Sequence, residues 1–244
     1  MKKKAIIISI KGFNLTRNEE MLFKNEKPWG VILFKRNIKS YEQIKSLIKR
    51  IKILSKNNKF PILIDEEGEK VSRLSKIIDN HVSQKIFGDI YQISPKLSSK
   101  LYSEYISRLC EFFKNLGINI NTVPVLDIFR KKTHKIIGNR SFSNNPLIVK
   151  KLGQLCVKNY MKKKIGTVIK HIPGHGCSMS DSHLTTPKVN EYYNNLDKID
   201  FFPFKSNRSF FAMTAHIVYS EIDKKNVATF SKKIISKIIR KKCN

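Results

Sequence analysis

The sequence predicts an α/β fold in which about six parallel strands form an incomplete barrel of the TIM, or (β/α)8, type. Short β-branched runs alternate with longer amphipathic segments, which is the pattern of βαβ units around a parallel sheet. The runs are almost continuously apolar, as strands buried on both faces are. Polar residues of unusual type follow several runs, at the end of the strands where such barrels carry their sites. An open doubly wound sheet is the alternative, but no G-x-G-x-x-G follows any run.

The strands are predicted from apolar runs of about five to nine residues, a length typical of buried strands. Right-handed crossovers between consecutive runs would place them side by side in one sheet. In chain order, the expected strands are residues 5–10, 30–34, 61–65, 118–126, 165–170 and 210–215.

The helices are predicted from apolar stripes at helical spacing and from the residues that flank them. Tyr41–Leu54 places its isoleucines and leucines on one face. Residues 98–116 do the same, and Gly117 is a suitable C-cap. Residues 146–164 follow two asparagines, one of which can cap the first turn. Two further helices are expected at residues 194–204 and, with Ser231 as its cap, at residues 231–242.

The length of 244 residues fits one barrel domain, residues 1–244. Because only six strands are predicted, the last two of the eight β/α units are expected to be missing. No apolar run approaches the roughly 20 residues of a membrane span, so no membrane partner is expected. The apolar stretch near the N-terminus, residues 5–10, is shorter than the roughly 7–15 residues of a secretory signal. The four cysteines lack C-x-x-C spacing, which favours a reducing, cytoplasmic location.

The formal net charge of +29 raises the hypothesis of a basic protein that binds polyanions. The lysines are spread along the whole chain, with only short runs such as residues 2–4 and 162–164. Lysine, isoleucine and asparagine are all abundant, and all three have A/T-rich codons, so codon bias accounts for the charge. A nucleic-acid partner is therefore not expected, and polyanion binding stays as an alternative.

The segment KHIPGHGCSMSDSH, residues 170–183, carries three of the six histidines. Its proline and glycines exclude a regular helix and predict a shaped loop. Asp181 and His183 are close enough for the carboxylate to accept the imidazole N–H, which suits proton transfer near neutral pH. The pair could equally be a contact that only stabilises the loop. Zinc binding by His171, His175 and His183 is a further alternative, disfavoured because Pro173 removes the helix on which HxxxH grips a metal.

Three other positions could contact a polar ligand. Asp65 ends a strand beside a glycine turn, where a carboxylate can bind two sugar hydroxyls, and Arg73 could reach the same ligand. Arg140 lies in a loop among apolar neighbours, which suits an anchored guanidinium. The alternatives are a solvated charged turn and an ordinary surface arginine. His216 follows a strand and is interpreted as structural.

Together, six segments resemble the N-terminal barrel domain of family-3 glycoside hydrolases, in particular the bacterial β-N-acetylhexosaminidases that recycle cell-wall fragments. The resemblance extends over roughly residues 5–242, and its KH-x-PGHG…DSH signature is specific. The segments are GVILFKRN, PILIDEEGEKVSRL, TVPVLDI, IGNRSF, KHIPGHGCSMSDSHLTTP and MTAHIVYS.

The resemblance implies a (β/α)8 barrel that removes terminal β-linked N-acetylglucosamine from muropeptides by a retaining mechanism, without cofactor or metal. It implies that His183 is the general acid/base and that Asp181 orients it. It also implies a set of residues that bind the sugar in subsite −1. These residues are Asp65, Arg73, Arg140, Lys170 and His171.

The chain departs from the family in two places. The usual Asp-Gln-Glu-Gly-Gly-Arg turn is replaced by Asp65 to Lys70, DEEGEK, which puts the geometry of that turn in question. No Ser-Asp-Asp motif, which holds the nucleophile at the seventh strand of the family, follows Met213. Six strands cannot close a barrel, so the first and sixth are expected to have unpaired edges.

These departures lead to two hypotheses besides polyanion binding. The first is a truncated or split β-N-acetylglucosaminidase that holds most of the sugar site but not the nucleophile, with a second polypeptide as a partner that supplies the missing strands. The second is a sugar-binding remnant without catalytic activity.

Overall fold

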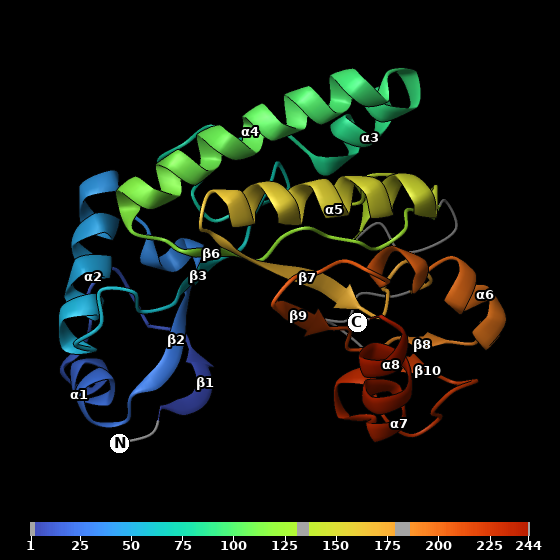
Figure 1. The fold of residues 1–244 in the computed structure, drawn as a ribbon. Helices are drawn as coiled ribbons and strands as arrows, with labels where there is room; N and C mark the ends of the chain where they lie inside the picture. Colours follow the sequence, from blue (N-terminus) through green and yellow to red (C-terminus); the bar gives the residue numbers. More distant parts are fainter. Residues whose placement is uncertain (1–2, 131–136, 179–185, 244) are drawn as a thin grey trace.

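The computed structural model describes residues 3–130, 137–178 and 186–243. Its main sheet has six strands, all parallel, in the order β1-β2-β3-β6-β7-β9. Figure 1 shows them as a curled half-barrel with helices outside it, among which α4 and α5 lie alongside each other. The strands are β1 Lys4–Ile8, β2 Pro28–Leu33, β3 Ile62–Ile64, β6 Ile120–Asn121, β7 Gly166–Ile172 and β9 Phe211–Thr214.

The connections between strands carry the helices and two small sheets. One small sheet is antiparallel and joins β4, Glu66–Gly68, to β5, Val71–Ser72. The other is parallel and joins β8, Lys188–Val189, to β10, Val218–Tyr219. The helices are α1 Arg17–Asn25, α2 Tyr41–Leu54, α3 Gln84–Ile93, α4 Pro95–Leu116, α5 Pro146–Lys162, α6 Tyr193–Lys198, α7 Lys232–Ile234 and α8 Arg240–Lys242, with a π-helical segment Ile235–Ile239 between the last two. Short 3₁₀ turns lie at Lys35–Asn37, Gly138–Arg140, Phe202–Phe204 and Ala228–Phe230.

The predicted helix signals act as expected. The α2 helix has the predicted bounds, and α4 starts a few residues early because the Ser94 side chain accepts from the Leu97 N–H. Gly117 ends α4 in the left-handed region, at φ 91°. Asn145 caps α5 through the Leu147 N–H.

Three predicted elements differ in the structure. The strand predicted at residues 118–126 is only Ile120–Asn121, because Pro124 has no N–H to donate to the sheet; pairing resumes at one bridge between Val125 and Lys170. The helix predicted at residues 194–204 is α6 followed by a separate 3₁₀ turn that contains Pro203. The last helix is interrupted by its π-helical segment, although Ser231 does cap it.

Two helices are absent from the prediction. The α1 helix begins with a capping box between Thr16 and Glu19, a signal that the sequence does contain. The α3 helix follows Ser83 without a side-chain cap, and it packs between α4 and α5. The position of α3 along the chain is therefore determined by its packing against α4 and α5.

The main apolar core lies between the convex face of the sheet and the helices, and a smaller cluster lies on another face. That cluster consists of Leu63, Ile120 and Val168, against which Trp29, Ile32 and Met213 pack. Successive strand residues point to opposite faces, so β2, β3 and β7 contribute to both clusters. Trp29 of β2 reaches Phe211 of β9, with ring centroids 5.2 Å apart.

Both edges of the sheet are unpaired within the part of the chain that the structure describes, as predicted. There, β1 pairs only with β2, and β9 only with β7. Apolar side chains beside these edges face solvent: Ile6 is 51% exposed and Phe210 is 78% exposed. No helix in the described ranges has the length and apolar character of a membrane span.

Candidate active site

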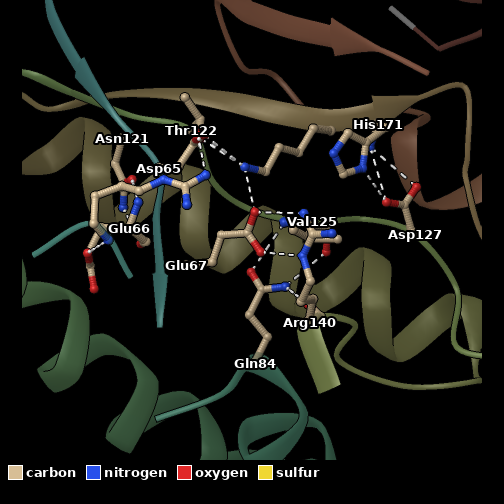
Figure 2. A network of polar contacts seen from close by, with 12 residues as sticks. Asp65, Glu66, Glu67, Gln84, Asn121, Thr122, Val125, Asp127, Arg140 and His171 are labelled. Atoms are coloured by element: carbon tan, nitrogen blue, oxygen red, sulfur yellow. Dashed lines mark hydrogen bonds and ion pairs between the residues drawn. The ribbon is translucent and has the colours of Figure 1, made fainter. Parts of the chain in front are cut away.

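A network of charged side chains gathers where the parallel strands end (Figure 2). Asp65 directly follows β3, and Lys170 and His171 lie near the end of β7. Because carboxyl ends of parallel strands meet at one rim, residues more than 100 positions apart become neighbours here.

Lys170 is the centre of the network. Its side chain is 2% exposed, and its Nζ lies 3.3 Å from Oδ1 of Asp65 and 2.6 Å from Oε1 of Glu67. The same ammonium donates to the Thr122 hydroxyl at 2.9 Å, and this hydroxyl in turn donates to Asp65. An ammonium buried in this way has its three donors satisfied, which fixes the orientation of both carboxylates.

Arg73 reaches Asp65 from the hairpin formed by β4 and β5. Its Nη2 donates to Oδ2 of Asp65 at 3.2 Å, and its side chain remains 31% exposed, so part of the guanidinium faces outward. The Glu66 carboxylate holds the hairpin by accepting from the Arg73 and Leu74 N–H groups.

The altered turn sequence leaves this contact in place. Gly68 occupies φ +123°, where a Cβ would lie 1.9 Å from the Val82 carbonyl oxygen, so only glycine fits. Glu69, which replaces the second glycine of the family, donates its backbone N–H to that same carbonyl at 3.3 Å.

Glu67 joins Arg140 to Lys170 and was not singled out from the sequence. Arg140 donates to Glu67 from Nε at 2.7 Å and from Nη2 at 2.9 Å, which is a bidentate pair. Gln84 donates to the Arg140 carbonyl and, at 3.1 Å, to the Val125 carbonyl. The position of Glu67 two residues after Asp65, in a short strand on the same rim, is the signal that could have identified it.

His171 is oriented by a fully buried carboxylate. Its Nδ1 lies 2.7 Å from Oδ2 of Asp127, and its side chain is 18% exposed. The His175 N–H also donates to Asp127, at 2.6 Å. Asp127 is one of the polar residues that follow the predicted strands, and the structure shows that it anchors the start of the 170–183 segment.

The cations of the network keep its carboxylates ionised despite burial. Burial opposes ionisation of Glu67, but Lys170 and Arg140 outweigh it and hold the pKa of Glu67 at about 2. Burial likewise opposes ionisation of Asp65, yet Lys170 outweighs it and keeps the pKa of Asp65 far below its ordinary value. Burial also disfavours the ionised form of Asp127, and the facing His171 overcomes this and lowers its pKa.

The network brings together four of the predicted substrate-binding residues: Asp65, Arg73, Arg140 and Lys170. The fifth, His171, follows Lys170 directly in β7 and is held by Asp127 instead. The predicted catalytic residues Asp181 and His183 lie outside the described residues. His216 is exposed, and its Nδ1 lies 2.7 Å from the Thr229 hydroxyl.

The zinc alternative involves one histidine that the structure does not describe. The rings of His171 and His175 are 5.6 Å apart, and His171 is already bonded to Asp127. Within residues 3–130, 137–178 and 186–243, no three histidine, cysteine or acidic side chains form a metal-binding group.

A rim of fixed donors and acceptors can recognise a molecule rich in hydroxyl groups. Carboxylates accept from hydroxyls, a partly exposed guanidinium donates to them, and an imidazole can donate or accept beside it. The ion pairs hold these groups in place before any ligand arrives, which lowers the entropy lost on binding. The fold and this rim define an α/β-barrel domain with a polar site at the carboxyl ends of its strands.

The family model "Glycosyl hydrolase family 3 N terminal domain" matches residues 2–244, and the chain belongs to this family. A beta-hexosaminidase of Neisseria gonorrhoeae (strain NCCP11945) is 32% identical over 240 residues, which are 97% of this chain and 66% of the relative. Beta-hexosaminidase A of Pseudoalteromonas piscicida is 30% identical over 231 residues, 86% of this chain and 38% of the relative. The chain thus spans about two thirds or less of the length of these relatives.

Solved structures give the same fold. NagZ from N. gonorrhoeae in complex with N-trifluoroacetyl-D-glucosamine matches with a TM-score of 0.89 and 29% identity, over 98% of this chain and 71% of that chain. A family-3 beta-N-acetylglucosaminidase from Paenibacillus sp. matches with a TM-score of 0.85 and 26% identity, over 96% and 45% of the two chains. The prediction of an incomplete barrel related to family 3 is confirmed.

Proposed function

We propose that this chain is the sugar-binding and acid/base part of an exo-acting, retaining β-N-acetylglucosaminidase. The observation that carries the proposal is the buried network in which Lys170 fixes Asp65 and Glu67 beneath a half-exposed Arg73. Such a fixed rim suits the terminal, non-reducing sugar, whose hydroxyl groups need donors and acceptors at defined positions.

In this proposal each residue has one task. Asp65 accepts from sugar hydroxyls, while Arg73 and His171 contact the same sugar from either side. Lys170 and Arg140 act on the sugar through Asp65 and Glu67, whose carboxylates they hold in place. His183 protonates the departing glycosidic oxygen and later activates water, and Asp181 keeps its imidazole in the required tautomer.

The retaining mechanism also needs a carboxylate nucleophile about 5–5.5 Å from the acid/base group. We assign this role to no residue of the chain, since Glu221 and Asp223 follow β10 and match no family nucleophile. Asp223 is already bonded to the Ser231 hydroxyl at 2.7 Å.

We propose that the nucleophile lies on the strands that complete the barrel, carried either by a further part of this polypeptide or by a second one. The unpaired edges of β1 and β9, with Ile6 and Phe210 exposed beside them, support a partner that adds strands there. A second copy of this chain suits the role poorly, because two chains of +29 repel each other.

The substrates proposed are peptidoglycan fragments that end in N-acetylglucosamine, in the cytoplasm. The free cysteines Cys110, Cys156, Cys177 and Cys243 are compatible with that reducing compartment.

Hydrolysis of 4-nitrophenyl N-acetyl-β-glucosaminide tests the proposal. The chain with its completing partner should release nitrophenol, and His183→Ala should abolish release without loss of sugar binding. Chelation should leave the rate unchanged, and a stoichiometric bound metal would contradict this mechanism.

Binding of N-acetylglucosamine without turnover, with any candidate partner, would favour the sugar-binding remnant instead. Loss of sugar binding in Arg73→Ala, but not in the distant Arg108→Ala, would locate the sugar at the network.

A further inference from the structure

A second concave region lies at the opposite end of the parallel strands from the network. Its wall includes Pro28, the first residue of β2, and Phe60, which precedes β3, so it opens at the amino-terminal ends of the strands. The hollow has a volume of about 950 Å³ and is lined by residues from the last turns of α1 and α2. This is the upper part of the range of about 300–1,000 Å³ found for small-molecule sites.

The wall of this basic hollow carries only one sign of charge. None of its lining residues is acidic, and its cations are Lys3, Lys24, Lys27, Arg50 and Lys56. Arg50 is paired with Glu20 at 2.8 Å. Lys24, Lys27 and Lys56 are exposed, and in the described ranges no carboxylate forms an ion pair with them. Positive charges gathered in a concavity raise the local concentration of anions.

Helix ends account for only part of this charge. The C-termini of α1 and α2 meet the hollow, and each carries a partial charge of about −0.5 that favours nearby lysines. These partial charges and Glu20 together offset about two of the cations, so the hollow keeps an excess of positive charge.

The base of the hollow is apolar. Phe23, Leu54 and Phe60 are buried beneath it, and Ile53, 55% exposed, lies at its side. An inorganic anion has no apolar part with which to bury this surface. An organic anion gains binding free energy when its apolar part covers the surface. The side chains of Asn25 and Asn57 add donors and acceptors at the rim.

We propose that the basic hollow binds a small organic phosphate of the nucleotide class. The phosphate groups lie among Lys24, Lys27 and Lys56, and the apolar or aromatic part covers Ile53. The site is separate from the saccharide network, because the two open at opposite ends of the strands, and it does not depend on the proposed glycosidase activity.

Titration calorimetry of the full chain with ATP as the probe tests the proposal. Lys24→Gln/Lys27→Asn/Lys56→Asn should weaken binding at least tenfold. Asparagine is chosen at the last two positions because both have φ near +50°, which asparagine tolerates. The matched control removes the same charge from exposed lysines of α4, through Lys96→Gln/Lys100→Gln/Lys114→Gln, and should leave the Kd within twofold.

Equal weakening by both triple variants would overturn the proposal, because it would mean diffuse attraction to a chain of +29. Inorganic triphosphate as tight as ATP would refute the apolar contribution, and competition by N-acetylglucosamine would refute a separate site. The single variant Lys24→Gln, with wild-type thermal unfolding, should still weaken ATP binding two- to fivefold, and Lys24→Arg should restore it.

Discussion

Glu67 is the most informative residue to change, because it is a buried carboxylate between two cations. Its pKa is held at about 2, against an ordinary value of 4.5. A carboxyl whose pKa is lowered by folding stabilises the folded state above its unfolded pKa and loses that effect as pH falls toward its folded pKa. The window for Glu67 therefore runs from about pH 4.5 down to about pH 2.

The size of the effect follows from the same two values. A difference of about 2.5 pKa units corresponds to about 3 kcal/mol of unfolding free energy at pH 7. At pH 3, Glu67 is still mostly ionised in the folded state but mostly protonated in the unfolded state, so a little less than half of this stabilisation remains. Glu67→Gln keeps the shape and removes the charge, so it should lower stability by about 3 kcal/mol at pH 7 and by about half of that at pH 3.

Urea denaturation of wild type and Glu67→Gln at the two pH values measures both differences. The control is Glu104→Gln, which breaks an exposed ion pair with Arg108 and should change stability by no more than about 0.5 kcal/mol. A loss at pH 7 that is no larger than that of the control, or a difference that does not shrink at pH 3, would refute the assignment of Glu67 as the ionised link between Lys170 and Arg140.

Three further changes test other parts of the molecule. Arg73→Ala should weaken N-acetylglucosamine binding about tenfold in calorimetry, since Arg73 is the half-exposed partner of Asp65; unchanged affinity would remove Arg73 from the site. Gly68→Ala should lower the unfolding free energy by at least about 2 kcal/mol, because its Cβ would overlap the Val82 carbonyl; equal urea midpoints would disprove the strained turn. At high salt, where the repulsion between chains of +29 is screened, Ile6→Lys should reduce aggregation in sedimentation experiments by placing a charge on the free edge of β1; unaltered aggregation would show that this edge is not the associating surface.

Local signals predicted much of the fold. The stripe of α2, the cap of α5 at Asn145 and the left-handed end of α4 at Gly117 are decided by neighbouring residues, and all are confirmed. The α3 helix was not predicted because its position depends on distant contacts: it has no side-chain cap and is held by α4 and α5.

The candidate site, like the fold, was predicted only in part from the sequence. The sequence by itself determined which residue types stand at the strand ends, and its motifs were enough to indicate the family and to name Asp65, Arg73, Arg140, Lys170 and His171. Only the tertiary structure decided that Lys170 contacts Asp65 across 105 positions of sequence, that Glu67 holds Lys170, and that Asp127 holds His171. The reason is physical: a buried ion pair is specified by the register of parallel strands and by the absence of water around it, and neither can be read from residues that are far apart along the chain.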